Sequence, residues 1–173
     1  MTVIVVDSRW PDLIPRDAIP HLDDAYIAHG WDDEARDRER AGEQVFVAAS
    51  LSDPVWQARE VMAAARARGG WEQAQTHESL VPYLLEESQE VVEAIGGPDA
   101  ELCGELSDVL LQVLFHAQIA QERGAFSFDD VAAAFVAKMR SRAPYLFDGS
   151  TGVVDATEQD RLWQEGKRRE REL

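Results

Sequence analysis

The amino-acid sequence predicts an all-α fold, a helical bundle built on an antiparallel two-helix hairpin and completed by dimerisation, with a small N-terminal α/β appendage. Three observations carry this prediction. Helix start and stop signals follow one another from Ser52 onward, one of these helices is apolar around most of its circumference, and the two β-type runs both fall before residue 51. We therefore place the appendage at residues 1–50 and the helical domain at residues 52–173.

The appendage holds two short β-type runs, Val3 to Val6 and Val45 to Ala48, separated by proline-containing and charged sequence. Two short strands make a small α/β cap and no large core. The cap has no cluster of chemically reactive residues, and we expect His21 and His29 to lie on its surface. Its role is not readable from the sequence.

The helical domain is divided by capping residues and glycines. Asp53-Pro54 is an N-cap followed by a proline at the first helical position, and Ser127-Phe-Asp-Asp130 is an acidic variant of the capping box. Glycines end the other helices. The expected helices are 54–68, 79–95, 99–123, 127–142 and a charged last helix from about Thr157.

Charge and composition exclude several classes of protein. The chain of 173 residues carries 17 Lys plus Arg against 33 Asp plus Glu, a formal charge of -16, so phosphate backbones are repelled and nonspecific nucleic-acid binding is excluded. A single cysteine excludes a disulfide framework and fits a reducing compartment. No run reaches the roughly 18 apolar residues of a membrane span, and the start lacks a basic leader region. We expect a cytoplasmic protein without membrane partners.

The helix at 99–123 predicts association between chains. Its apolar residues between Val109 and Ile119 spread around most of the circumference, so the helix needs cover on nearly every side. The single chain offers one other strong helix beside it. We therefore expect a homodimer or a higher homo-oligomer.

Acidic residues fall on the packed sides of the two hairpin helices. Glu87 lies in the middle of the apolar stripe of its helix and Glu90 at the stripe's edge, one turn on. Glu105 and Asp108 are likewise one turn apart and border the stripe of the next helix. In an antiparallel hairpin, residues at equal height have a constant sum of numbers, which pairs Glu87 with Asp108 and Glu90 with Glu105. The two layers are about 4.5 Å apart at 1.5 Å rise per residue.

Four carboxylates this close repel one another and need a countercharge to stay ionised. Hard divalent cations with oxygen ligands supply it, and Mg²⁺ is the expected ion, with Mn²⁺ as a substitute. The competing interpretation is a set of ordinary solvated acids in an acidic protein.

The acidic motifs resemble those of the MazG family of all-α nucleoside triphosphate pyrophosphohydrolases. The family pattern Glu-Glu-x-x-Glu followed by Glu-x-x-Asp is present at residues 86–90 and 105–108. The surrounding sequence at residues 71–91, 105–117 and 138–147 also resembles the family. Two stretches depart from the family: Gly-Gly-Trp-Glu at 69–72 replaces Cys-Pro-Trp-Asp, and Ala-Pro-Tyr at 143–145 replaces His-Pro-His.

The resemblance implies hydrolysis of a nucleoside triphosphate to a monophosphate and pyrophosphate, with a role in cleansing the nucleotide pool. By the family pattern the Mg²⁺ ligands are Glu87, Glu90, Glu105 and Asp108. Glu86, beside that cluster, is the best candidate to orient or deprotonate the attacking water. No Walker-type loop is present to hold phosphates, so metal and cationic side chains must hold them. The residues implied to bind substrate are Lys138, Arg142, Trp163 and Lys167, with Trp163 under the base.

Two other functions remain open from the sequence. One is a noncatalytic helical dimerisation module that retains the acidic residues without their activity. The other is a dUTPase-like pyrophosphatase with a narrower choice of nucleotide and the same arrangement of acids. A di-iron bundle does not fit, because no histidine stands three residues after Glu87 or Glu105. His116 is about 16 Å along the helix from Glu105 and is expected in the core or an interface. Cys103 is expected to be a small buried residue.

Overall fold

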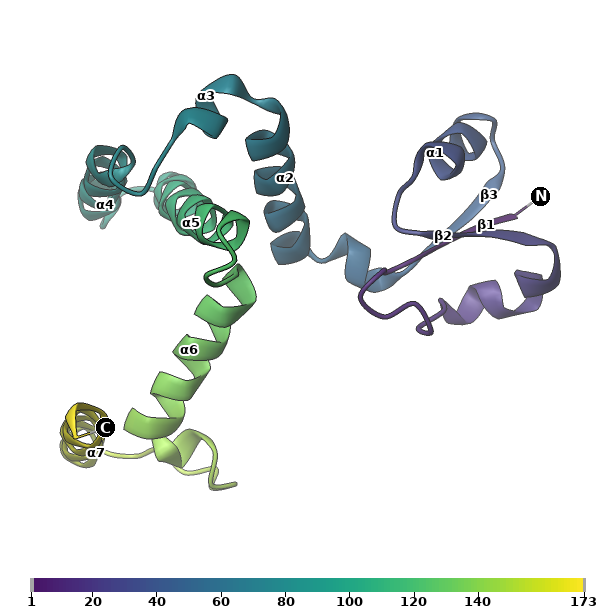
Figure 1. Cartoon of the computed structure of the whole chain (residues 1–173). Helices are drawn as coiled ribbons and strands as arrows, with labels where there is room; N and C mark the ends of the chain where they lie inside the picture. The colour runs from purple at the N-terminus through teal and green to yellow at the C-terminus, as the bar shows by residue number, and fades with distance from the viewer. Residues whose placement is uncertain (1, 173) are drawn as a thin grey trace. The chain divides into compact units, whose positions relative to one another are not determined.

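The computed structural model describes residues 2–172 and divides the chain into two compact units, one ending at Gln73 and the other beginning at Ala74 (Figure 1). Residues 54–73 lie in the first unit, and the division near residue 50 that the sequence predicts stays a prediction about domains. The elements in chain order are β1 (Thr2–Val6), η1 (Arg16–Asp24), β2 (Ala25–His29), α1 (Asp33–Arg40), β3 (Gln44–Val47), η2 (Ala49–Ser52), α2 (Pro54–Arg68), α3 (Gly70–Ala74), α4 (Val81–Ala94), α5 (Asp99–Glu122), α6 (Phe128–Arg142), η3 (Pro144–Leu146) and α7 (Ala156–Arg171), where η marks a 3₁₀ helix.

The chain is mostly helical, with a small parallel sheet in the first unit. The sheet has three strands in the order β2-β1-β3, and Val3 of the central strand pairs with Tyr26 and Val45. The two strands expected from the sequence are confirmed as β1 and β3. The sequence missed β2, whose side chains are mostly half-buried or exposed, as befits an edge strand.

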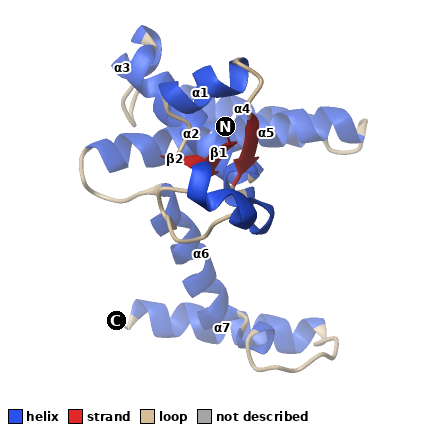
Figure 2. Cartoon of the chain, turned by 90° about the vertical axis from the view of Figure 1, so that its right-hand side faces the viewer, coloured by secondary structure: helices blue, strands red, loops and turns tan. Residues whose placement is uncertain are grey.

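The sheet is covered on both faces, as the strands in red and the helices in blue show in Figure 2. Val3 and Val5 point to one face and pack with Ala35 of α1, whereas Ile4 and Val6 point to the other and pack with Ala18 of η1. Because β1 is buried on both faces, its sequence is a continuous apolar run rather than an alternating one.

The helix boundaries follow the capping signals of the sequence. Asp53 caps α2 by accepting a hydrogen bond from the amide of Trp56, with Pro54 at the first helical position. Ser127 and Asp130 form both hydrogen bonds of a capping box at the start of α6. Gly96 and Gly124 adopt φ values of 89° and 69° just beyond α4 and α5, a conformation that glycine enters without strain. The expected helices are confirmed to within two residues.

Two helix pairs organise the second unit. Helices α4 and α5 are joined by residues 95–98 and pack against each other, and α6 packs against both α5 and α7. The α6–α7 contact depends on Gly166, where a Cβ atom would lie 2.8 Å from the Cα of Arg142. Glycine is therefore the residue that permits this close approach.

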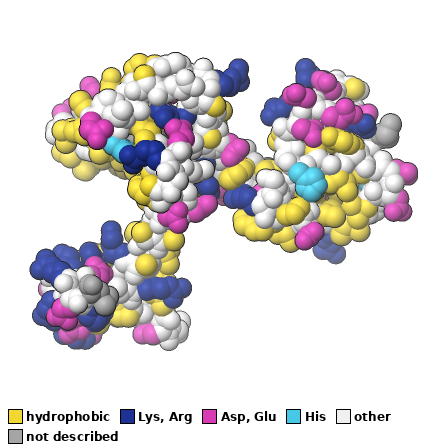
Figure 3. Space-filling view, in the orientation of Figure 1, with side chains coloured by type: hydrophobic (Ala, Val, Ile, Leu, Met, Phe, Trp, Pro, Cys, Tyr) yellow, Lys and Arg dark blue, Asp and Glu magenta, His cyan; other side chains and the backbone are white. Residues whose placement is uncertain are grey.

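Large apolar side chains are exposed along α5, within the yellow areas that Figure 3 shows over the second unit. The exposed fractions are 52% for Leu106, 39% for Leu110 and 43% for Leu111. Cys103, expected to be buried, is exposed instead, because it lies on the same side of the helix as Leu106 and Leu110. Within residues 2–172, no helix combines the length and the apolar character needed to cross a membrane.

Candidate metal and substrate site

Three carboxylates come together where α4 packs against α5. One ligand oxygen each of Glu87, Glu105 and Asp108 lies within 4.8 Å of the others, and all three side chains are half-buried. Glu87 comes from α4 and the other two from consecutive turns of α5. The arrangement follows from the i, i+3 spacing on α5 and from the short connection between the helices.

Two carboxyl groups of this cluster have raised pKa values. Burial raises the pKa of Glu87, and the charges of Asp108 and Glu90 raise it further. Burial also raises the pKa of Glu105, with the charges of Glu90 and Asp108 adding to the shift. Glu90 is exposed and lies outside the three-residue group, but it acts on both of its buried neighbours. A hard divalent cation fits this set of oxygen donors, because it would offset both the burial of the carboxylates and their mutual repulsion.

Glu86 stands beside this group without belonging to it. Its side chain is exposed, whereas that of Glu87 is half-buried. Adjacent residues of a helix are rotated by about 100°, so the two carboxylates face different surroundings. Glu86 is therefore accessible to water and free to act separately from the three clustered acids.

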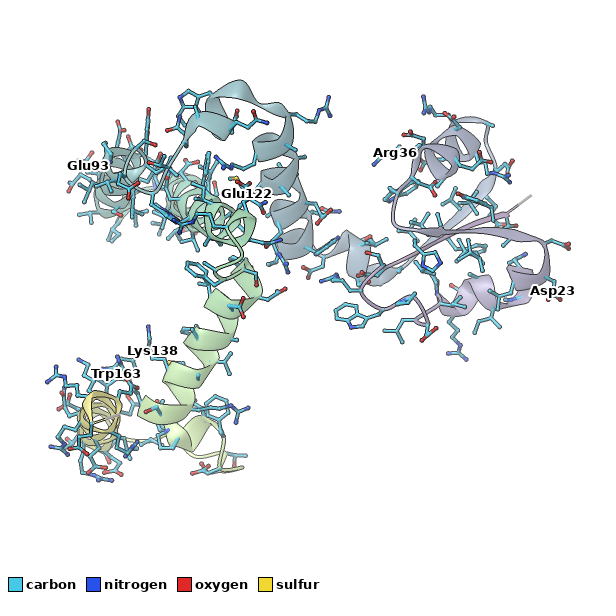
Figure 4. The ribbon with its side chains drawn as sticks, in the orientation of Figure 1. Asp23, Arg36, Glu93, Glu122, Lys138 and Trp163 are labelled. Carbon is cyan, nitrogen blue, oxygen red and sulfur yellow. The ribbon has the colours of Figure 1, made fainter. Side chains whose placement is uncertain are left out.

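The expected substrate-binding residues come from two helices that pack against each other, Lys138 and Arg142 from α6 and Trp163 and Lys167 from α7. Figure 4 labels Lys138 and Trp163. The guanidinium of Arg142 lies 5.2 Å from the ring centroid of Trp163. Arg142 also donates three hydrogen bonds to Glu170, the shortest 2.6 Å from Nη2 to Oε2. This hydrogen bond raises the pKa of Arg142 and lowers that of Glu170. Glu170 thus holds the guanidinium in place and competes with an incoming phosphate for it.

A hollow of about 430 Å³ adjoins this contact. Arg142 and Trp163 line it, together with three polar side chains that the sequence analysis did not assign to the site: Tyr145, Gln159 and Asp160. Gln159 and Asp160 are four and three residues before Trp163 and therefore share its face of α7, which is the signal that pointed to them. The hollow offers an aromatic face, a cation and hydrogen-bonding groups to a nucleotide.

Two family comparisons cover most of the chain. Residues 75–147 match the family described as the MazG nucleotide pyrophosphohydrolase domain, and residues 1–69 match the family described as the MazG N-terminal domain. The chain belongs to the MazG family. The pyrophosphohydrolase match contains the clustered acids, Lys138 and Arg142, whereas Trp163 and Lys167 lie beyond its end.

Curated relatives of the MazG chain carry matching names. Nucleoside triphosphate pyrophosphohydrolases of Mycolicibacterium smegmatis and Mycobacterium tuberculosis are 36% and 34% identical to it, over 100% and 99% of this chain and 64% and 63% of theirs. The nucleoside triphosphate pyrophosphohydrolase/pyrophosphatase MazG of Thermotoga maritima is 52% identical over 47% of this chain and 32% of its own length. The chain therefore spans less than two thirds of these relatives.

A solved structure shares the MazG fold. The crystal structure of a mazG-related protein from Thermotoga maritima superposes with a TM-score of 0.56 at 26% sequence identity. The likeness covers 65% of this chain and 97% of that one.

The acidic and basic residues of this MazG chain belong to different helix pairs. Among residues 74–172, the structure shows no ion pair or hydrogen bond that joins the clustered acids to Lys138, Arg142 or Lys167. Helix α6 leads from the α4–α5 pair to α7 (Figure 1). One copy of the second unit thus carries the clustered acids on the α4–α5 pair and the basic residues on the α6–α7 pair.

A histidine pair links the start of α4 to α5 in the MazG domain, and the sequence analysis missed it. The Nδ1 atoms of His77 and His116 are 2.8 Å apart, and Nη2 of Arg123 is 2.9 Å from Nε2 of His77. The Nε2 atom of His116 is buried and has no hydrogen-bond partner within the described chain. Burial lowers the pKa of His116, and His77 lowers it further. The pair fixes the segment that precedes the acidic helix.

Proposed function

We propose that the chain catalyses the hydrolysis of nucleoside triphosphates to a nucleoside monophosphate and pyrophosphate, as a cytoplasmic enzyme that cleanses the nucleotide pool. The observation that carries this proposal is the group of three clustered carboxylates inside a MazG pyrophosphohydrolase domain. The names of the relatives support the same activity.

Mg²⁺ is the ion that suits the site, with Mn²⁺ as a substitute. Glu87, Glu105 and Asp108 would hold it, with Glu90 completing the set. When bound, the metal supplies positive charge for the triphosphate and for the clustered acids. The raised pKa values of Glu87 and Glu105 support this assignment, because burial and then the neighbouring negative charges disfavour their ionised forms when no cation is bound.

The remaining roles fall to residues outside the clustered acids. Glu86 orients or deprotonates the attacking water, since it is exposed and one position away from the metal-binding face. Lys138, Arg142 and Lys167 contact the phosphates. Trp163 stacks on the base, with the guanidinium of Arg142 beside its ring.

We further propose that catalysis requires a homodimer whose core is formed by the antiparallel α4–α5 hairpin of each chain. The exposed leucines of α5 support association. The separation of the acidic and basic faces within one chain supports a site that is completed by a second copy. In this assignment residues 52–173 form the catalytic domain, and residues 1–50 an appendage.

The test is a panel of ribo- and deoxyribonucleoside triphosphates incubated with Mg²⁺, with both products identified. We expect monophosphate and pyrophosphate in equal amounts, and no turnover in excess EDTA. Glu105→Gln should abolish turnover, whereas Glu93→Gln, an exposed change on α4 outside the cluster, should preserve it. Release of orthophosphate, or full activity in EDTA, would contradict the proposal. Turnover confined to dUTP would assign the narrower dUTPase-like activity.

A further inference from the structure

A cavity of about 580 Å³ opens in the first unit at the carboxyl ends of the strands. Ser8, beyond β1, lines it together with His29 at the end of β2 and Leu51, beyond β3. Strands β2 and β3 lie on opposite sides of β1, so the strand order reverses at the central strand. Open parallel sheets bind ligands outside the carboxyl ends of their strands at such a reversal, and the volume is that of a small-molecule pocket.

Two indole rings from different elements line this cavity, which we call the sheet-edge cavity. Trp31 comes from the turn between β2 and α1, and Trp56 comes from α2. Gly30 in this turn has no side chain, adopts a φ of 94° and leaves open space where a Cβ atom would stand. A flat ligand can therefore approach the backbone of this turn and lie against an aromatic surface.

Trp56 is held in place by a partly buried ion pair. The guanidinium of Arg9 lies 3.7 Å from the ring centroid of Trp56, and its Nη2 atom donates a 2.6 Å hydrogen bond to Asp7. The Asp7 side chain is only 1% exposed at the end of the central strand. The hydrogen bond from Arg9 holds the pKa of Asp7 well below its usual range. The wall formed by Trp56 is thus fixed to the sheet.

The charges around the sheet-edge cavity select against polyphosphates. Asp32 and Glu60 line it together with one cationic residue, Arg36. Of the two guanidinium groups over the Trp56 ring, that of Arg9 is paired with Asp7, and that of Arg59 lies 5.3 Å from the ring centroid. Carboxylates accept hydrogen bonds from hydroxyl and amino groups, and they repel phosphate. The charge of -16 on the whole chain adds to that repulsion. The fitting ligand is an uncharged aromatic heterocycle that carries hydroxyl groups.

We propose that the sheet-edge cavity binds a nucleoside. The base lies against Trp31 and Trp56, and the sugar hydroxyls donate to Glu60 and to the remaining lone pairs of Asp32, whose oxygens also accept from Ala35 and Tyr26. This site is formed by the first unit alone, and is distinct from the hollow between α6 and α7, so it stands independently of the proposed hydrolysis. It gives the N-terminal part of the chain a ligand-binding role.

The test is ligand-observed saturation-transfer NMR on the full chain in EDTA, with adenosine, cytidine and ATP as probes. We expect transfer to the base protons of at least one nucleoside. Trp31→Ala should weaken its affinity at least about fivefold, the low end of the range for one base–aromatic stack. The matched control is Trp71→Ala, a 52% exposed tryptophan of α3 that does not line the cavity, and it should bind as the wild type does.

Two further variants keep the proposal open to refutation. Glu60→Gln changes an exposed side chain of α2 and should lower nucleoside affinity severalfold, so it decides the matter if Trp31→Ala does not fold. Trp163→Ala removes the aromatic wall of the α6–α7 hollow, so nucleoside binding that persists in this variant belongs to the sheet-edge cavity. Binding lost in Trp163→Ala, binding equal in wild type and Trp31→Ala, ATP bound more than tenfold tighter than adenosine by Trp163→Ala, or no transfer from either nucleoside at millimolar concentration would each overturn the proposal.

Discussion

Glu86 and Glu87 are neighbours in the chain with different surroundings, one exposed and the other half-buried beside Asp108. If Glu86 acts on water, Glu86→Gln should lower kcat by roughly 10² to 10⁴ while Mg²⁺ affinity changes little. Glu87→Gln should weaken Mg²⁺ binding directly. Calorimetric titration of Mg²⁺ into both variants, with turnover at saturating metal, measures the two effects. An equal loss of metal affinity in both variants would show that the roles are divided wrongly.

Asp108 contributes to the repulsion that raises the pKa of Glu87. A carboxyl with a raised pKa in the folded state stabilises the fold only when protonated, so this group costs stability at neutral pH. Asp108→Asn should therefore raise the melting temperature of the metal-free protein by about 2–4 °C at pH 7. Thermal unfolding in EDTA and in Mg²⁺ measures this. The wild type should gain more from Mg²⁺ than the variant does, and the reverse order would contradict a metal site.

His116 couples folding to pH through burial, which is the main cause of its lowered pKa. Near and below the ordinary histidine value of about 6.5, the unfolded chain binds more protons at this position than the folded one. Stability is therefore lost as pH falls from about 7 toward 5. His116→Phe should flatten this dependence in urea unfolding curves recorded from pH 8 to pH 5. A variant with the same slope as the wild type would assign the dependence to other groups.

At the scale of elements, Gly166 sets how closely α7 approaches α6. A methyl group at this position would meet Ser141 and Arg142 of α6 at 2.8 Å. Gly166→Ala should cost roughly 1–3 kcal/mol of stability and displace Trp163 from Arg142. Gly104→Ala is the matched control, because a Cβ atom there has open space in the middle of α5 and alanine favours helix by about 0.5–1 kcal/mol. Urea unfolding of both variants should give shifts of opposite sign.

The sequence predicted elements wherever their signals are local. The N-cap at Asp53, the capping box at Ser127 and the glycines after α4 and α5 fixed helix ends to within two residues. Strand β2 and helix α1 were missed, because β2 is short and α1 is so rich in charge that its single buried residue, Ala35, gives no apolar stripe. What decides both is packing against β1, which is not a local property.

In the candidate site, too, the sequence predicted what depends on local spacing and missed contacts between distant residues. The spacing of Glu105 and Asp108 and the short α4–α5 connection were enough to predict which acids lie near Glu87, although their role as metal ligands stays a prediction. The contact between His77 and His116 joins residues 39 positions apart. No periodicity within one helix signals such a pair, and the same is true of the two tryptophans that line the sheet-edge cavity.

At the scale of the whole molecule, the uncovered leucines of α5 predict a stable dimer. Light scattering at micromolar concentration should give twice the 19.3 kDa mass of one chain. Leu110→Asp places a charge on this face and should produce monomers, whereas Leu13→Asp, at a 65% exposed position of the first unit, should leave the dimer intact. An active monomeric wild type would refute both the dimer and the need for a second copy in catalysis.

Because Cys103 is exposed, the reactivity of its thiol can be used to measure dimer formation. It is the chain's single cysteine, so a thiol reagent modifies one defined position, which lies one helical turn from Leu106 and two from Leu110. When a second copy covers that side of α5, the thiol is shielded and its alkylation slows. Dilution below the dissociation constant restores the fast rate. The alkylation half-life, followed by mass spectrometry across a dilution series, therefore measures dissociation of the dimer without an engineered label.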